Sequence, residues 1–91
     1  MTIQQSVRQF IADNFYVSDP AELADDTLLV TSGIVDSTGM LEIIAFLEAD
    51  FGIRIGDQET TQENLGSIAR IAAFVERKLG AVAGLRAVPA E

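Results

Sequence analysis

Hydrophobic residues recur at three- and four-residue intervals in three stretches of the chain, which is the spacing of one face of an α-helix. The stretches cover residues 2–16, residues 36 or 37 to 51, and residues 67–79. Each contains one apolar stripe: Ile3, Val7, Phe10, Ile11 and Phe15 in the first, Met40, Ile43, Ile44, Leu47 and Phe51 in the second, and Ile68, Ile71, Ala72, Val75 and Leu79 in the third. The pattern predicts an all-α fold, a small bundle in which three main helices bury these stripes against one another.

Residues with capping chemistry mark the ends of the predicted helices. Thr2, Asp36 and Ser67 precede the stripes, and their side-chain oxygens can accept hydrogen bonds from the free N–H groups of a first turn. Gly52 and Gly80 follow the second and third stripes, where glycine suits the left-handed conformation that ends a helix. We therefore expect the third main helix to end just before Gly80.

The remaining segments complete the predicted architecture. Residues 17–36 form a long first loop, and its apolar patch, residues 28–30, is expected to pin the loop onto the core. Residues 61–65 are typical of one short helical turn with Thr60 or Thr61 as its cap. We expect one domain over residues 1–80, followed by a flexible tail of small residues over 81–91.

The charge of the chain limits its partners. The 91 residues include 6 Lys plus Arg and 14 Asp plus Glu, so the net charge is 6 − 14 = −8. This charge disfavours nucleic acid and anionic membrane surfaces, because both require a basic face. It favours protein partners with Arg and Lys patches, although an acidic surface also keeps a small protein in solution without any further role.

Neither a membrane span nor a secretion signal is apparent in the sequence. No apolar run approaches the roughly 20 residues that cross a bilayer. The first ten residues, MTIQQSVRQF, lack the pattern of a signal peptide. We expect a cytoplasmic protein, and we expect it to be a monomer.

The chain contains no Cys and no His, which excludes several kinds of site. A disulfide framework, a zinc finger and a cysteine nucleophile are all impossible. A serine hydrolase is a poor hypothesis because no histidine can serve as the base. The acidic stretch DPAELADD lacks the central Gly and final Glu of an EF-hand, so we expect no metal site. Any thiol chemistry needs a group that is added later.

The most informative residues are Asp36 and Ser37, at the start of the second main helix. A helix N-terminus presents unpaired N–H groups and partial positive charge, so a phosphate bonded to Ser37 would be well placed there. Asp36 brings a carboxylate beside the hydroxyl, where it can cap the helix or support modification of the serine. Taken alone, Asp–Ser at a helix start is common and indicates no more than a capping pair.

The wider sequence resembles the acyl carrier protein family, which includes the peptidyl carriers of nonribosomal synthesis. The family hallmark is Asp-Ser-Leu, preceded by Gly and followed by an amphipathic helix, and here the stretch reads GIVDSTGMLEIIAFLEADFGIRI. The attachment serine of the family falls on Ser37, its preceding acid on Asp36, and its helix acids on Glu42 and Glu48. The segment TTQENLGSIARIAAFVERKL resembles the third and fourth helices of the family, and the resemblance covers residues 2–80.

The resemblance implies a non-catalytic carrier. In this family a phosphopantetheinyl transferase moves 4′-phosphopantetheine from coenzyme A to the serine that matches Ser37. The thiol of this arm then holds an acyl or aminoacyl group as a thioester, which agrees with a chain that has no sulfhydryl of its own. Further implied partners are an adenylating enzyme or acyltransferase that loads the arm and the biosynthetic enzymes that use the cargo. We expect a polyketide, nonribosomal peptide or related specialised pathway.

The resemblance also makes the outer side of the second main helix the expected docking face. We define this docking face by five residues: Thr38, Leu41, Glu42, Ala45 and Glu48. The alternative for its acids is an ordinary solvated helix face, and for Leu41 an edge-of-core position. Thr38 stands where the family usually has a leucine that contacts the transferase and other partners, so this departure bears on partner identity.

Three further residues of this helix need an interpretation. Gly39 is unfavourable so early in a helix, and less bulk near the arm is one explanation. Met40 lies on the apolar stripe and is expected to pack in the core rather than contact the cargo. Phe46 lies on the flank of the stripe, where it can pack or contact the cargo.

A second hypothesis belongs to another functional class. A small acidic helical adaptor could bind a protein partner without any prosthetic group. It would keep the same fold but would not need Ser37. Modification of Ser37 therefore separates the two hypotheses.

Overall fold

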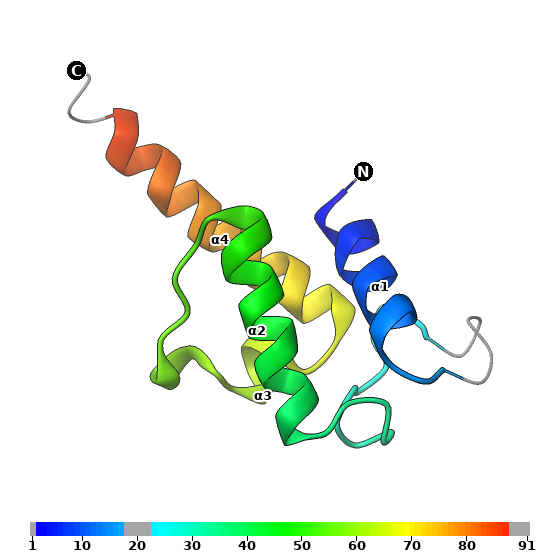
Figure 1. The fold of residues 1–91 in the computed structure, drawn as a ribbon. Helices are drawn as coiled ribbons and strands as arrows, with labels where there is room; N and C mark the ends of the chain where they lie inside the picture. Colours follow the sequence, from blue (N-terminus) through cyan, green and yellow to red (C-terminus); the bar gives the residue numbers. More distant parts are fainter. Residues whose placement is uncertain (1, 18–22, 88–91) are drawn as a thin grey trace.

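The computed structural model describes residues 2–17 and 23–87, and describes side chains as far as residue 80. These residues form the helices α1 (Ile3–Asn14), α2 (Ser37–Phe51), α3 (Gln62–Leu65) and α4 (Ile68–Ala87), with a 3-10 turn, η2 (Asp57–Glu59), before α3 (Figure 1). No strand occurs in the described part of the chain. The predicted fold class, three main helices with one short helix and a long first loop, is confirmed.

The predicted caps begin the helices where the pattern placed them. At α1, the Thr2 side chain accepts from the Gln5 N–H and the Gln5 side chain accepts from the Thr2 N–H, which completes a capping box. Asp36 caps α2 and Thr61 caps α3. The Ser67 hydroxyl accepts from the backbone N–H of Arg70 at the start of α4.

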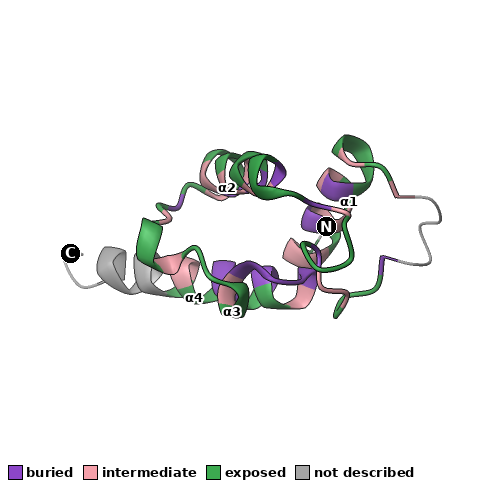
Figure 2. Cartoon of the chain, turned by 90° about the horizontal axis from the view of Figure 1, so that it is seen from below, coloured by how far each residue is buried: buried purple, intermediate pink, exposed green. Residues whose placement is uncertain are grey.

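The core lies between the facing sides of α1, α2 and α4, where Figure 2 shows the buried segments. Val7 and Ile11 of α1 and Ile43 and Leu47 of α2 are fully buried, as the stripes predicted. The α4 stripe is buried as well, with Leu79 half-buried at its end. Other stripe residues of α1 and α2 are half-buried and pack against this core: Ile3, Phe10, Phe15, Met40, Ile44 and Phe51.

Aromatic packing joins α1 to α2. The Phe46 ring stacks on the Phe10 ring with 4.2 Å between centroids and an interplanar angle of 13°. Phe51 meets Phe46 edge-on at 6.1 Å. Phe46 therefore packs between the helices, one of the two roles that its flanking position allowed.

The first loop is attached to the core through part of its apolar patch. Leu29 is fully buried, and its N–H donates to the carbonyl of Gly66 at 2.9 Å. Arg8 of α1 donates to the Leu23 carbonyl and pairs with Asp25, which fastens the start of the second described range to α1. Val30, by contrast, is 54% exposed. The patch therefore anchors the loop at Leu29 rather than along its whole length.

The predicted end of the last helix is wrong. Gly52 does adopt the left-handed conformation, with φ of 67°, and ends α2. Gly80 does not end α4, which continues to Ala87 and extends beyond the other helices (Figure 1). The sequence after Gly80 is rich in Ala and has no proline until residue 89, so helix propensity carries the backbone through a glycine that is compatible with helical angles. Mobility of residues 81–91 stays a prediction.

No helix in the described ranges has the length and apolarity needed to cross a membrane.

Candidate functional site

Ser37 is the first residue of α2, and its side chain is exposed at the end of the helix where the backbone N–H groups are unpaired. Asp36 holds this turn: its Oδ1 accepts from the Gly39 N–H at 2.7 Å, and its carbonyl accepts from the Met40 N–H at 2.9 Å. The Ser37 hydroxyl makes no hydrogen bond to any residue that the structure describes. Ser37 is therefore exposed, and its hydroxyl is not engaged by the described residues.

Gly39 is buried although the three residues before it are exposed. A Cβ added at Gly39 would lie 2.5 Å from Cε1 of Phe15, the residue that follows α1. The space left by the missing side chain is therefore filled by an aromatic ring from α1. This packing, rather than extra room beside the hydroxyl of Ser37, accounts for a glycine in the first turn of α2.

The docking face is open over most of its predicted residues. Thr38, Leu41, Glu42 and Ala45 are exposed, and Leu41 presents 66% of its surface to solvent. Glu48 differs, because its Oε2 accepts from the Ile55 N–H at 2.9 Å and the residue is half-buried. This carboxylate ties the extended segment after α2 back onto the helix, a structural role that sequence reasoning missed.

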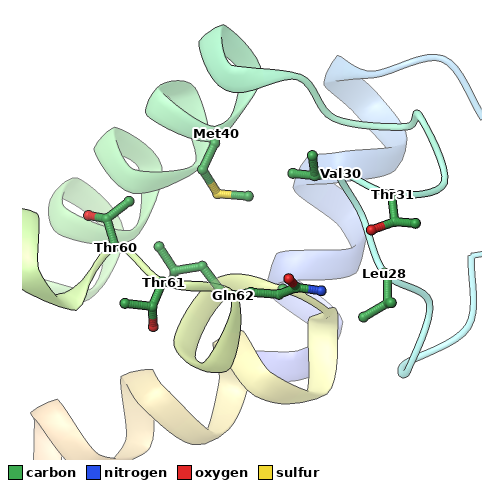
Figure 3. A pocket seen from close by; sticks show the side chains of 9 residues that line it. Leu28, Val30, Thr31, Met40, Thr60, Thr61 and Gln62 are labelled. Carbon is green, nitrogen blue, oxygen red and sulfur yellow. The ribbon is translucent and has the colours of Figure 1, made fainter.

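A cavity of about 250 Å³ opens beside the first turns of α2 (Figure 3). Met40 of α2 lines it together with residues of the first loop and of the segment that leads into α3: Leu28, Val30, Thr31, Thr60, Thr61, Gln62, Leu65 and Gly66. Met40 therefore packs against the core, as predicted, and also faces a cavity. Sequence reasoning missed the cavity because its walls come from separate segments whose juxtaposition no local pattern reveals.

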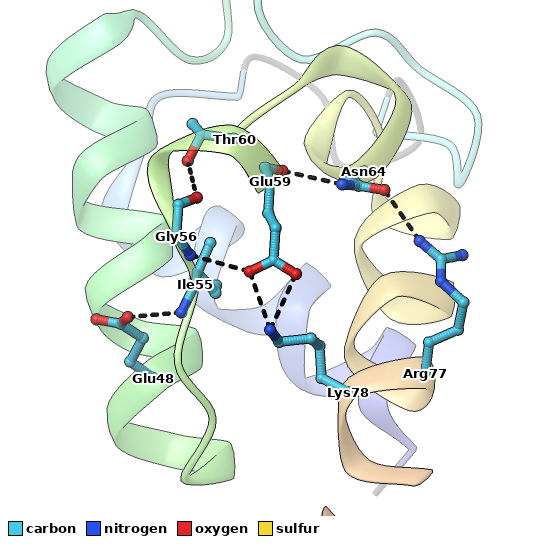
Figure 4. A network of polar contacts seen from close by, with 8 residues as sticks. All are labelled: Glu48, Ile55, Gly56, Glu59, Thr60, Asn64, Arg77 and Lys78. Atoms are coloured by element: carbon cyan, nitrogen blue, oxygen red, sulfur yellow. Dashed lines mark hydrogen bonds and ion pairs between the residues drawn. The ribbon is translucent and has the colours of Figure 1, made fainter. Parts of the chain in front are cut away.

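A polar network fastens one wall of this cavity to α4 (Figure 4). The Glu59 carboxylate accepts from the Gly56 N–H at 3.0 Å and from Nζ of Lys78 at 2.9 Å. Asn64 donates to the Glu59 carbonyl at 3.0 Å and accepts from Arg77 at 2.9 Å. The Gly56 N–H, followed by the Lys78 ammonium, lowers the pKa of the Glu59 carboxyl. The network thus joins η2 and α3 to α4.

Comparison with known proteins finds relatives that match almost from end to end. The chain is 30% identical over 80 residues to the acyl carrier protein of Solidesulfovibrio magneticus, a match that covers 88% of this chain and 99% of the relative. It is 29% identical over 76 residues to the D-alanyl carrier protein of Streptococcus pyogenes, covering 84% and 94% of the two chains. No model of a known protein family matches the chain.

Proposed function

The chain belongs to the acyl carrier protein family, and we propose that Ser37 bears a covalent 4′-phosphopantetheine arm on which the protein holds an acyl or aminoacyl group. The observation that supports this site most strongly is the exposed Ser37 hydroxyl at the first residue of α2, directly after the capping Asp36. The carrier itself is not an enzyme in this proposal. It is the substrate of a phosphopantetheinyl transferase and presents cargo to other enzymes.

The residues around Ser37 suit a phosphodiester. The first turn of α2 offers unpaired backbone N–H groups and the positive end of the helix dipole, and both favour a phosphate at this position. When bound, the arm supplies a terminal thiol that takes up the cargo as a thioester, in a chain that has no Cys of its own. Asp36 keeps the turn helical through its bond to the Gly39 N–H, which presents the hydroxyl outward.

The docking face supports recognition by partner enzymes. Its four exposed members follow Ser37 along α2, and Leu41 offers an apolar contact. Glu42 provides a free carboxylate for a basic patch on the transferase or on a loading enzyme, whereas the carboxylate of Glu48 is engaged within the chain. Electrostatic steering toward such partners weakens with salt. At an ionic strength of about 0.1 M, exposed charges that are more than about 10 Å apart are largely screened from each other.

The names of the relatives mention an acyl and a D-alanyl cargo, and the proposal includes both classes. An acyl cargo would be loaded by an acyltransferase or acyl-adenylating enzyme, and an amino acid by an aminoacyl-adenylating enzyme. We place the carrier in specialised metabolism because Thr38 departs from the usual leucine after the attachment serine.

The proposal is tested by incubating the purified unmodified protein with coenzyme A and a broad-specificity phosphopantetheinyl transferase, followed by intact mass spectrometry. We expect a gain of about 340 Da, the mass that the composition of the arm predicts. Ser37→Ala should abolish the gain. Ser32→Ala is the matched control, since Ser32 is an exposed loop serine whose hydroxyl donates to the Leu29 carbonyl, and this variant should be modified like the wild type.

Two other outcomes of this experiment would contradict the proposal. An unchanged mass of the wild-type chain with several transferases, each active on a known carrier in parallel, would contradict the proposal. So would a gain that persists in Ser37→Ala. The first result would favour the acidic adaptor, and the second would place the arm on another residue.

A further inference from the structure

The first turn of α2 contains residues with low helix propensity, so its conformation depends on contacts from outside the helix. Its second and third residues after the cap, Thr38 and Gly39, are poor helix formers, and glycine in particular leaves the backbone free to leave the helical conformation. Helix ends also lack the internal hydrogen bonds of a middle turn. The backbone that presents Ser37 therefore needs a packing contact from outside the helix to hold one orientation.

The ring of Phe15 makes this packing contact with the first turn of α2. Its ring lies so close to Gly39 that an added Cβ would meet Cε1 at 2.5 Å and Cζ at 3.1 Å, and the Asp36 cap at 3.2 Å. Real Cβ atoms essentially never approach another heavy atom within 3.0 Å. The aromatic ring and the capping carboxylate thus converge on the same bare backbone position, two residues after Ser37.

Neighbouring groups fix the position of the Phe15 ring. Phe15 follows the last turn of α1, and its N–H donates to the Ile11 carbonyl at 2.9 Å. Its ring meets Phe10 edge-on, with centroids 6.3 Å apart, and Phe10 stacks on Phe46 of α2. The ring that touches the first turn of α2 is therefore backed by an aromatic cluster that is anchored on both helices.

We propose that Phe15 is a positioning residue for the modification of Ser37, because its ring seated on Gly39 holds the first turn of α2 in the orientation that a phosphopantetheinyl transferase requires. This inference rests on the proposed function. In this transfer the Ser37 oxygen bonds to the phosphorus that carries the pantetheine of coenzyme A, the pyrophosphate bond breaks, and adenosine 3′,5′-bisphosphate and the hydroxyl proton leave. The rate depends steeply on the placement of the attacking hydroxyl, and a displacement of about 1 Å can cost as much as a hundredfold. Phe15 does not touch the hydroxyl, and it acts through Gly39.

A purely structural role for Phe15 makes a different prediction. If the ring only filled space between α1 and α2, its removal would lower global stability and leave the modification of the folded fraction unchanged. A positioning role lowers kcat for modification of folded protein and loosens the first turn of α2 selectively. The kinetic constants and the amide exchange of the unmodified chain separate the two roles.

The test compares Phe15→Ala, Gly39→Ala and the double variant Phe15→Leu/Gly39→Ala with wild type. Ile3→Ala is the control, since Ile3 also packs from α1 onto the core but lies at the opposite end of that helix. Modification by the transferase is followed by intact mass under conditions where every variant is folded. Amide exchange is measured at residues 39 and 40, whose N–H groups bond to Asp36.

We expect Phe15→Ala and Gly39→Ala each to lower kcat about tenfold, with KM within about twofold of wild type. Exchange at residues 39 and 40 should accelerate in Phe15→Ala. The double variant should recover most of the rate lost in Gly39→Ala, because leucine leaves room for the new Cβ and alanine restores helix propensity. Ile3→Ala should leave both measurements unchanged.

Wild-type kcat and exchange in the two single variants would overturn the inference, as would an equal loss of kcat in Ile3→Ala. Failure of the double variant to exceed Gly39→Ala would also overturn it, since the contact would then not explain the loss. An unmodified wild-type chain is a different result, which refutes the proposed function and this inference with it.

Discussion

At the scale of single residues, Asp36 caps the start of α2. Its carboxylate accepts from the Gly39 N–H at 2.7 Å and so satisfies a donor that the helix leaves free. We predict that Asp36→Ala lowers the free energy of unfolding by about 1 kcal/mol, the usual cost of losing an N-cap. Asp36→Asn should lose much less because asparagine also caps well. Urea unfolding of both variants tests this, and equal losses would contradict a capping role.

Glu48 and Glu42 lie on the same helix but differ in what they bind. Glu48 accepts from the Ile55 N–H at 2.9 Å, whereas Glu42 is exposed. We predict that Glu48→Ala lowers the free energy of unfolding by about 1 kcal/mol, while Glu42→Ala changes it by less than about 0.5 kcal/mol. Thermal and urea unfolding of the two variants measure the difference. A larger loss in Glu42→Ala would refute this assignment of roles.

Sequence reasoning at this scale succeeded where function depends on neighbours in the chain. Asp36 and Ser37 are adjacent, and helix periodicity placed them at a helix start, where the structure has them. It failed where a partner comes from elsewhere. Gly39 is explained by Phe15, which directly follows another helix, and Glu48 bonds to a backbone N–H seven residues along the chain. No spacing rule reveals such contacts before the elements are assembled.

At the scale of elements, the short helix α3 depends on polar contacts with α4. Four residues are too few for a helix that is stable alone, and the Glu59–Lys78 pair holds the preceding turn η2 to α4. The pair is partly exposed, with 36% of the Glu59 side chain and 27% of the Lys78 side chain open to solvent. We therefore expect a small, pH-dependent contribution to stability from these contacts.

The sign of the pH dependence follows from the direction of the Glu59 shift. The Gly56 N–H and Lys78 lower the pKa of the Glu59 carboxyl in the folded state. The contribution is fully present above the unfolded pKa of glutamate, about 4.3, and is lost as pH falls through the lower folded value. We predict that Glu59→Gln destabilises the protein at pH 7 and that this difference from wild type shrinks progressively as the pH falls below about 4.

Unfolding midpoints of wild type and Glu59→Gln between pH 7 and pH 3 check this prediction. Glu63→Gln is the matched control because Glu63 is an exposed carboxylate on α3. The control should follow wild type at every pH. A difference between wild type and Glu59→Gln that grows as the pH falls would have the wrong sign and would contradict the assigned pair.

Helix starts were more predictable than helix ends. Side-chain caps are local and chemically specific, so Thr2, Asp36 and Ser67 were placed from the sequence. For α3 the sequence left Thr60 and Thr61 as candidates, and the structure uses Thr61. A glycine ends a helix only where the backbone turns to positive φ, as at Gly52. At Gly80 the Ala-rich sequence that follows continues the helix instead. Glycine alone does not distinguish these two outcomes.

At the scale of the whole molecule, the hydrophobic core of the described residues extends from Val7 to Val75, with Leu79 packed at its edge. We predict that removal of residues 81–91 changes the free energy of unfolding by less than about 0.5 kcal/mol, since every core residue with a described side chain precedes residue 80 and chain termini usually contribute little. Urea unfolding of the shortened chain measures this. A loss above about 2 kcal/mol would show that the domain extends beyond residue 80.

The account as a whole depends on where the arm is attached. Fragmentation of the transferase-treated chain in a mass spectrometer locates the added mass of about 340 Da on a single residue. The account predicts that the mass lies on Ser37, the exposed first residue of α2. Added mass on the neighbouring Thr38, on Ser32 or on any other residue would contradict it.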